Sequence, residues 1–305
     1  MLDLHTHSSF SDGSDTPLEL ARAASAVGLR AIALTDHDTT LSYPDMRLAC
    51  DEWGVELVSG VEVSLRDNAF PLASGAHEGA RNVHLLAYFV PLEATHPLQQ
   101  ELARLRQDRE ERNLALVQLL NERGFDRITL HYLVTLAGGP ESIGRPHFAR
   151  AMFELHPEIV GERTEESWNR VFVEWLGHTG KAYLPKTSMP LERFVDAGRG
   201  AGVVFSIAHP LVNYLDQGAS SIERTMPAVL HSLRERGVHG VEAYYGSSDA
   251  ATRALMVKLT RDAGMIPTGG SDYHGAYKPE VRLGRGRSGD LLVPDEILDE
   301  MKAAR

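Results

Sequence analysis

The chain has 305 residues, which suits one large α/β barrel or two ordinary domains and leaves ample length for a buried core. Its 31 Lys and Arg against 42 Asp and Glu give a net charge of −11, which argues against long duplex nucleic acid as the main partner. The lone cysteine excludes an intramolecular disulfide, and no signal peptide and no apolar run of roughly 20 residues is present, so we expect a cytoplasmic protein without a membrane segment.

The first ninety residues alternate predicted strands and helices. Strands are predicted at 1–5, 31–35, 55–61 and 83–89. The continuous apolar run at 31–35 is typical of a parallel strand that is buried on both faces. Thr16 and Pro17 predict the start of a helix, which Gly28 ends, and a second helix near 44–53 ends at Gly54.

From residue 97 to 190 the alternation stops, and helices are predicted instead. A long amphipathic helix ends at Gly124, and shorter ones follow near 129–137, 146–154 and 165–177. The alternation then resumes, with strands at 203–208, 238–243 and 265–270 and helices near 223–236 and 249–263. The seven strands predict a (β/α)7 barrel, formed by 1–96 and 191–305, with a mostly helical insertion at 97–190.

Metal-binding residue types follow these strands, and in such barrels the chemistry sits at the C-terminal strand ends. Residues at or just beyond a predicted end are His5, Asp36, His37, Glu62, His209 and Asp272. His84 falls early in its own strand and fits this pattern less well.

His5 and His7 stand two residues apart on a strand, so both side chains point to one face. Asp272 and His274 repeat the spacing near the other end of the chain, and together the two pairs predict a metal site. Asp12, in the polar loop after His7, is either a further ligand or a turn residue.

In T-D-H-D at 35–38, His37 is the predicted ligand, and Asp36 and Asp38 either orient an imidazole or cap a helix. Glu62 lies within an apolar run, where an unpaired charge is very costly, so it requires a cation.

His84 and His209 interrupt apolar strands in the same way and are either ligands or hydrogen-bonded core histidines. Glu242 has the apolar setting of Glu62 but no histidine nearby in the sequence. It is therefore a candidate for a supporting or substrate-binding residue.

The candidate ligands are His5, His7, Asp12, His37, Glu62, His84, His209, Asp272 and His274. They exceed the three or four protein ligands of a single zinc ion, so we expect two or three divalent ions that share the Glu62 carboxylate. Histidine and carboxylate without cysteine favour Mn²⁺, our first choice, or Fe²⁺ or Zn²⁺. The net positive charge of such a site suits a phosphate.

The motifs H-x-H, loop Asp, T-D-H-D, G-x-E-x-S, V-H, A-H-P and S-D-x-H occur in this order and resemble the PHP (polymerase and histidinol phosphatase) superfamily over 1–95 and about 195–290. The resemblance implies a distorted (β/α)7 barrel with a trinuclear site. It assigns His5, His7, Glu62 and Asp272 to one ion, Glu62, His84 and His209 to a second, and Asp12, His37 and His274 to a third. Of these ligands, Glu62, His209 and Asp272 are the candidate catalytic residues.

Within the insertion, L-R-x-x-R-x-x-R, G-R-P-H-F-A-R and G-K-A-Y-L-P-K resemble stand-alone members that act on nucleotides, including nucleoside 3′,5′-bisphosphate phosphatases and a 5′→3′ exoribonuclease. Arg145 lies at a predicted helix N-terminus, where a guanidinium suits a phosphate; the alternative is a surface ion pair. His147 and Lys186 are further substrate-binding candidates, and we expect the insertion to cap the active site.

We therefore expect a metal-dependent phosphoesterase that hydrolyses a phosphate monoester of a small nucleotide by attack of a metal-bridging hydroxide. We expect the substrate to be a nucleoside 3′,5′-bisphosphate or a nucleoside 5′-monophosphate, with His147 or metal-bound water as the group that protonates the leaving alcohol. The alternatives are a 5′→3′ exoribonuclease on short RNA, a histidinol-phosphate phosphatase and, without catalysis, a structural or metal-sensing module. The sequence leaves the oligomeric state open.

Overall fold

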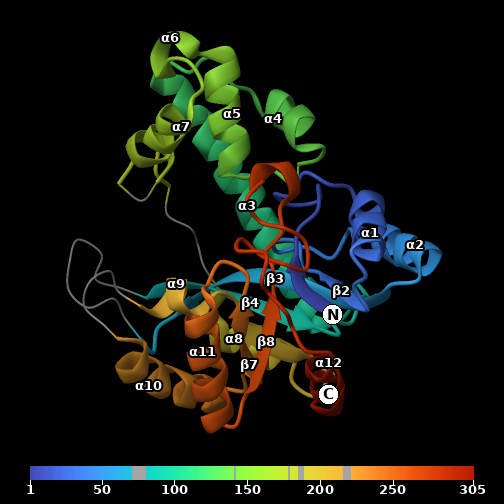
Figure 1. Cartoon of the computed structure of the whole chain (residues 1–305). Helices are drawn as coiled ribbons and strands as arrows, with labels where there is room; N and C mark the ends of the chain where they lie inside the picture. The colour runs from blue at the N-terminus through green and yellow to red at the C-terminus, as the bar shows by residue number, and fades with distance from the viewer. Residues whose placement is uncertain (71–79, 141, 178, 185–188, 216–220) are drawn as a thin grey trace. The chain divides into compact units, whose positions relative to one another are not determined.

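A computed structural model of the chain describes residues 1–70, 80–140, 142–177, 179–184, 189–215 and 221–305. The chain separates into two compact units (Figure 1). The barrel unit comprises Met1–Ser8, Gly13–Ala103 and Ser188–Arg305, and the helical unit comprises Ser9–Asp12 and Arg104–Thr187. The division falls within one long helix.

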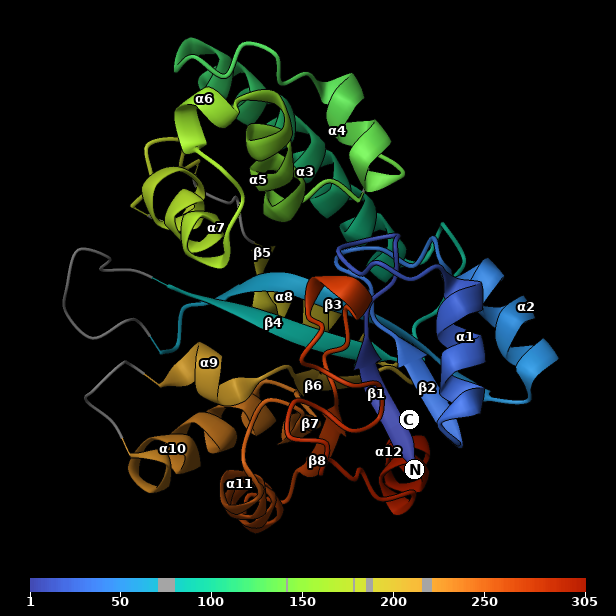
Figure 2. The same cartoon turned by 45° about the horizontal axis from the view of Figure 1, so that its top comes forward.

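The barrel unit is built on a sheet with the strand order β1-β2-β3-β4-β6-β7-β8. These strands are β1 (Leu2–Thr6), β2 (Ala31–Leu34), β3 (Glu56–Asp67), β4 (Arg81–Tyr88), β6 (Val204–Ile207), β7 (Gly240–Tyr245) and β8 (Ile266–Gly270). A short strand, β5 (Met189–Pro190), pairs with β3 and has no counterpart among the predicted strands. A parallel bridge between Thr6 and Tyr273 places the segment after β8 beside β1, so the sheet nearly closes (Figure 2). The predicted seven-strand barrel is confirmed.

One strand departs from a simple parallel barrel. β4 pairs in antiparallel fashion with both β3 and β6, whereas the other pairs between main strands are parallel. The early part of β4 therefore lies at the end of the sheet where its parallel neighbours finish. This direction explains why His84, which precedes the end of its strand, still belongs with residues at the strand ends.

The helices of the barrel unit begin and end where their local sequence directs. Thr16 caps α1 (Pro17–Ala26) in a reciprocal arrangement with Glu19, and Pro17 occupies the first turn. α2 (Tyr43–Trp53) ends at Gly54, whose φ of 69° favours glycine. The remaining helices are α8 (Leu191–Ala197), α9 (Pro210–Tyr214), α10 (Ile222–Glu235), α11 (Ala250–Asp262), the 3₁₀ turn Gly275–Tyr277 and α12 (Glu296–Ala303).

The core of the barrel unit follows from the apolar strand runs. All four residues of β2 are buried, as expected for a strand covered on both faces. Leu2 and Leu4 of β1 pack with Leu86 and Tyr88 of β4 and with the apolar face of α12. Among the described residues, no helix is long and apolar enough to cross a membrane.

The helical unit has a core of its own. Its helices are α3 (Pro97–Glu122), shared with the barrel unit, α4 (Leu130–Ala137), α5 (Arg145–Leu155), α6 (Pro157–Val160), α7 (Glu165–Val171) and a π-helical turn, Phe172–Leu176. Phe125, Leu133, Phe148 and Met152 are fully buried in this core. Gly124 follows α3 with a φ of 97°, and Thr129 caps α4 through its side chain.

Candidate metal centre

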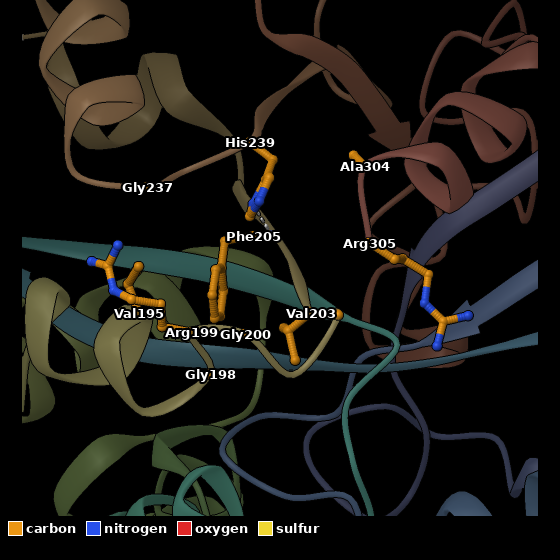
Figure 3. A pocket seen from close by; sticks show the side chains of 11 residues that line it. Val195, Gly198, Arg199, Gly200, Val203, Phe205, Gly237, His239, Ala304 and Arg305 are labelled. Carbon is orange, nitrogen blue, oxygen red and sulfur yellow. Dashed lines mark hydrogen bonds between the residues drawn. The ribbon is translucent and has the colours of Figure 1, made fainter.

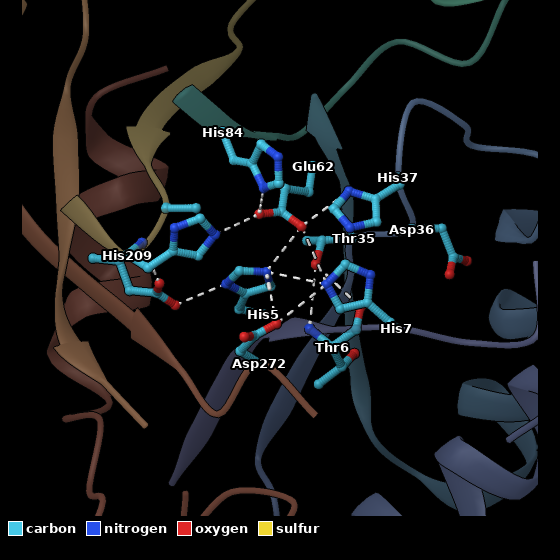
Figure 4. A network of polar contacts seen from close by, with 12 residues as sticks. His5, Thr6, His7, Thr35, Asp36, His37, Glu62, His84, His209 and Asp272 are labelled. Carbon is cyan, nitrogen blue, oxygen red and sulfur yellow. Dashed lines mark hydrogen bonds and ion pairs between the residues drawn. The ribbon is translucent and has the colours of Figure 1, made fainter. Parts of the chain in front are cut away.

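Glu62, on β3, is the centre of a cluster of histidines (Figure 4). Its side chain is 1% exposed, and its two oxygens have different partners. Oε1 lies 2.9 Å from Nδ1 of His84 and 3.0 Å from Nε2 of His209. Oε2 lies near three further imidazole nitrogens, at 3.2 Å from His7, 3.2 Å from His37 and 3.3 Å from His5. The structure thus gathers side chains from several strands around one carboxylate.

A second carboxylate, Asp272, approaches the same Nε2 atoms of His5 and His7 as Glu62 does. Its Oδ1 is 3.6 Å from Nε2 of His5 and 3.5 Å from Nε2 of His7. Its Oδ2 accepts hydrogen bonds from Lys278 at 2.9 Å and from the hydroxyl of Tyr245 at 3.2 Å. Asp272 therefore directs one oxygen toward the histidines while two donors hold the other.

His274 completes this part of the cluster. Its ring centroid lies 4.2 Å from that of His7, and its Nδ1 is 2.8 Å from the backbone oxygen of Asp272. The ring of His37 also lies beside that of His7, with ring centroids 4.8 Å apart. The predicted pairs at the two ends of the chain therefore meet in one place.

Three residues in or next to the cluster have an unusual backbone conformation. Asp38, His209 and Asp272 have φ values of 56°, 29° and 58°, in the left-handed region that non-glycine residues rarely adopt. Such conformations persist where surrounding contacts over-determine them, and they cluster at functional sites. The turns that leave β2, β6 and β8 thus depart from extended geometry next to the cluster.

Glu242 supports two members of the cluster. Its Oε1 accepts a hydrogen bond from Nδ1 of His5 at 2.9 Å, and its Oε2 accepts one from the backbone N–H of His209 at 2.7 Å. In the neutral form of His5 this contact keeps the proton on Nδ1, which would leave the Nε2 lone pair free for a cation between His5, His7 and Glu62. Of the two roles proposed for Glu242 from sequence, this contact favours support of the histidines.

The aspartates on either side of His37 form hydrogen bonds with neighbouring segments of the chain. Asp36 accepts hydrogen bonds from the backbone and side chain of Ser8 at 2.8 Å each and from Ser42 at 2.6 Å. Asp38 accepts one from the backbone N–H of Ser64 at 2.8 Å. These contacts hold the segment after β2 against the segments that carry His7 and Glu62.

The charges of the cluster perturb one another. Burial by itself raises the pKa of Glu62, but His37, His5 and His84 hold that pKa well below its usual range. Burial opposes protonation of His5, yet the neighbouring Glu242 and Glu62 raise its pKa well above the ordinary value. Asp272 behaves as Glu62 does: burial raises its pKa, and contacts with His7, His5 and His274 lower it further than burial raises it.

The donor set fits divalent cations. The described residues give the buried Glu62 imidazole partners but no Lys or Arg partner. Two groups of side chains in the barrel unit present ligand atoms that all lie within 4.8 Å of one another: His5, His7 and Asp272, and His37, Glu62 and His84. Nitrogen and carboxylate oxygen in this combination suit Mn, Fe or Zn.

The remaining predicted site residues belong to the helical unit or lie outside the described residues. Asp12 is in the segment Ser9–Asp12 of the helical unit, and its role as a ligand stays a prediction. Arg145 is exposed at the start of α5, and His147 is buried on the same helix. Burial lowers the pKa of His147, against the opposing charge of Asp12, which favours a neutral imidazole at neutral pH. Lys186 lies outside the described residues.

Three residues near the cluster were absent from the sequence-based set: Asp3, Tyr245 and Lys278. Asp3 carried a usable signal, because it shares a strand face with His5 and His7. Tyr245 and Lys278 carried none, because they reach the site only through the folded positions of the end of β7 and the loop after β8.

The barrel unit also has a cavity of about 300 Å³ that is separate from this cluster (Figure 3). It lies at the starts of β6 and β7 and is lined by Val203, Phe205, His239 and Arg305, among others. It shares no residue with the histidine and carboxylate cluster, so it gives no reason to move the candidate site.

Comparisons with known proteins agree with this geometry. The family model of the PHP domain matches residues 3–189. A 3′,5′-nucleoside bisphosphate phosphatase from Chromobacterium violaceum is 28% identical over 277 residues, 90% of this chain and 87% of that protein. A 5′-3′ exoribonuclease from Haemophilus influenzae is 26% identical over 273 residues, 89% of each chain.

A solved structure from Bifidobacterium adolescentis, provisionally described as a metal-dependent phosphoesterase, matches with a TM-score of 0.78 and 27% identity and covers 99% of this chain and 96% of that one. The barrel, the clustered ligands and these similarities define a metal-dependent phosphoesterase. The chain belongs to the PHP domain family.

Proposed function

We propose that the protein hydrolyses a phosphate monoester of a small nucleotide, either a nucleoside 3′,5′-bisphosphate or a nucleoside 5′-monophosphate. The cluster around Glu62 carries this proposal, because it concentrates imidazole and carboxylate donors at one end of the barrel sheet. The Chromobacterium violaceum relative, named for its action on nucleoside bisphosphates, supports the nucleotide part.

In this proposal the cluster holds two or three divalent ions, with Mn²⁺ as the first choice. His5, His7, Glu62 and Asp272 hold one, Glu62, His84 and His209 a second, and His37, His274 and Asp12 a third. Bound ions would lower the pKa of a water molecule that they hold, so that hydroxide is available near neutral pH. They would also neutralise charge on the phosphate oxygens.

The residues of the chain then provide orientation. Glu242 fixes the tautomer of His5 and the backbone at His209, and Tyr245 and Lys278 hold the outer oxygen of Asp272. We propose that Arg145 contacts a phosphate of the substrate, as the N-terminal end of α5 favours anions. His147, as a neutral imidazole, is suited to hydrogen bonding rather than to donating a proton from an imidazolium.

Phosphate release from a panel of substrates tests this function. The purified protein, with added Mn²⁺, is offered AMP, a nucleoside 3′,5′-bisphosphate, histidinol phosphate and short 5′-phosphorylated RNAs. We expect turnover of one of the first two. Turnover of histidinol phosphate alone, or of none of the four, would refute the nucleotide assignment.

The same panel addresses a second candidate, a 5′→3′ exoribonuclease, which the similarity to the Haemophilus influenzae enzyme favours. Release of mononucleotides from the 5′ end of RNA at a rate well above mononucleotide turnover would support it. Release of inorganic phosphate from mononucleotides without shortening of RNA would support the monoesterase.

A further inference from the structure

Asp3 is a buried carboxylate with an unusual set of partners. It lies on β1, two residues before His5, and its side chain is fully buried. Oδ1 accepts hydrogen bonds from the backbone N–H of Ser271 at 2.8 Å and of His5 at 3.4 Å. Oδ2 accepts from the hydroxyl of Ser271 at 2.5 Å and from the backbone N–H of Gly284 at 2.7 Å. All four donors are neutral.

Such a carboxylate is a costly way to fill a core position. A buried charge without a cationic partner depends entirely on its hydrogen bonds. An ionised carboxylate is purely an acceptor with two oxygens, so it can receive all four donors at once. An asparagine amide of the same shape has an NH₂ group in place of one of these oxygens. That NH₂ group would face the N–H donors of Ser271 and His5, or the O–H of Ser271 and the N–H of Gly284.

Ser271 is the partner that matters for the metal centre. It comes directly before Asp272, whose left-handed φ of 58° requires restraint from its surroundings. The backbone N–H of Asp272 donates to the backbone oxygen of His5 at 2.9 Å, and that of His7 donates to the backbone oxygen of Tyr273 at 2.9 Å. The segment that carries Asp272 is thus hydrogen-bonded to His5 on β1 and to His7 just after β1.

The segment after β8 packs closely against β1, so its backbone has little room to shift. Gly270, just before Ser271, has no space for a side chain, because a Cβ there would overlap the backbone of His5. Asp3 restrains the segment one residue further on, through both the backbone and the hydroxyl of Ser271. The carboxylate of Asp272 then lies 3.5–3.6 Å from Nε2 of His7 and His5.

We infer that Asp3 is a positioning residue: it fixes Ser271 against β1 so that the strained Asp272 presents its carboxylate to His5 and His7 for metal binding. The inference rests on the proposed metal role of those three residues. Asp3 itself is not among the proposed ligands, because both of its oxygens accept hydrogen bonds from Ser271 and Gly284. Its effect on metal affinity passes through Asp272.

The test measures metal binding directly. We compare wild type, Asp3→Asn and Ser271→Ala for ions bound per chain and for Mn²⁺ affinity by titration, together with the denaturant midpoint. We expect Asp3→Asn to lose an ion or to bind it about 10- to 100-fold more weakly, the range for residues that orient metal ligands. Excess Mn²⁺ should restore part of the activity of this variant. Ser271→Ala keeps the backbone contact and should show a smaller loss in the same direction.

Asp67→Asn is the matched control. Asp67 is also a fully buried carboxylate of the barrel unit, but it accepts hydrogen bonds from Arg236 and Tyr214, outside the cluster. We expect Asp67→Asn to lose stability while keeping the metal content and affinity of wild type. If Asp3→Asn behaves in the same way, Asp3 is a structural residue and the inference fails.

Two further outcomes are distinguishable. If Asp3→Asn does not fold, Ser271→Ala decides, and wild-type Mn²⁺ affinity in that variant overturns the inference. If wild type itself binds no divalent ion, the proposed function fails before the role of Asp3 arises. Metal binding by wild type with equal affinity in both Asp3 and Ser271 variants removes the inference and leaves the proposed function standing.

Discussion

Glu62 concentrates the chemistry of the site in one side chain. One of its oxygens faces His84 and His209, and the other faces His5, His7 and His37. This division is the arrangement that a carboxylate shared by two cations requires, because each oxygen has its own set of nitrogen neighbours. Burial adds to the requirement, since a buried charge is very costly unless it is paired.

Glu62→Gln should therefore remove most of the bound metal and most of the turnover. The amide keeps the shape of the side chain but replaces one anionic oxygen by an N–H₂ donor, which cannot bind a cation. Ions per chain by elemental analysis and phosphate release report the effect. Glu56→Gln, a change on the same strand in a surface pair with Lys302, is the control and should match wild type. A Glu62→Gln protein with full metal content and near-normal turnover would rule out the shared carboxylate.

Arg145 is the residue of the helical unit that the proposed function assigns to a substrate phosphate. It is exposed at the first turn of α5 with Pro146 beside it. If its guanidinium contacts a substrate phosphate, Arg145→Ala should lower kcat/KM by about 30- to 1,000-fold, which corresponds to roughly 2–4 kcal/mol. Arg145→Lys should recover part of this loss, because an ammonium keeps the charge but not the planar pair of donors.

Steady-state kinetics with metal content as a second readout check this prediction. A fall in kcat indicates contact with the transferred phosphate, and a rise in KM indicates contact with another part of the substrate. Arg150→Ala, which breaks a surface pair with Glu154 on the same helix, is the control. Arg145→Ala within about twofold of wild type in both constants would make Arg145 an ordinary surface residue.

At the scale of elements, the sequence predicts the strands well and their directions less well. Apolar runs in the sequence locate all seven main strands, because a buried strand leaves a continuous apolar signature. The direction of β4 leaves no such signature, since an apolar alternation reads the same in either direction. The antiparallel pairing of β4 with β3 and β6 is what places His84, near the start of its strand, beside the ends of the parallel strands.

The residues of the candidate site could likewise be predicted only in part from the sequence. His5, His7, Asp272 and His274 could be paired from their spacing, because a two-residue step on a strand keeps side chains on one face. The contacts of Asp3 with Ser271 and Gly284 could not be predicted, because serine and glycine there carry no metal-ligand spacing that would link them to β1. Left-handed backbone at Asp272 and His209 is likewise set by tertiary contacts rather than by residue type.

A buried ion pair joins four elements on another part of the barrel unit. Asp67, at the end of β3, accepts hydrogen bonds from Arg236 after α10 at 2.8 and 3.0 Å and from Tyr214 of α9 at 2.7 Å. Arg236 also contacts Glu192 of α8 at 2.9 Å. Burial raises the pKa of Asp67, but the hydrogen bonds and charge of Arg236 and the hydroxyl of Tyr214 lower it overall.

Asp67→Asn should therefore destabilise the protein in a pH-dependent way. We expect a loss of about 3 kcal/mol at neutral pH, the low end for breaking a buried pair, because Glu192 remains beside Arg236. The folded pKa of Asp67 lies below its unfolded value of about 3.9, so its stabilisation is complete above that pH and is lost as the pH falls through the folded pKa. Urea unfolding at several pH values should give a constant difference from wild type between about pH 5 and 8 that narrows below about pH 4. A difference independent of pH down to pH 3 would contradict the ion-pair explanation.

At the scale of the whole molecule, the cluster links segments from both ends of the sequence. His5 and His7 lie on and just after β1, and Asp272 and His274 follow β8, the strand that nearly closes the sheet. Glu62, His84 and His209 add β3, β4 and the turn after β6. Ions bound here would therefore hold together the seam at which the barrel closes, and their binding free energy would add to the stability of the folded chain.

Metal removal should consequently affect both activity and stability. We expect two or three divalent ions per chain in the purified protein, and complete loss of turnover on chelation that added Mn²⁺ reverses. An ion present at 100 times its Kd stabilises the folded state by about 2.7 kcal/mol, so chelation should lower Tm by about 5–10 °C. Glu62→Gln should show a smaller shift, because it has less metal to lose, and this comparison separates the effect of the site from other effects of the chelator. One ion or none per chain, with turnover and Tm unchanged by chelation, would overturn the metal centre itself.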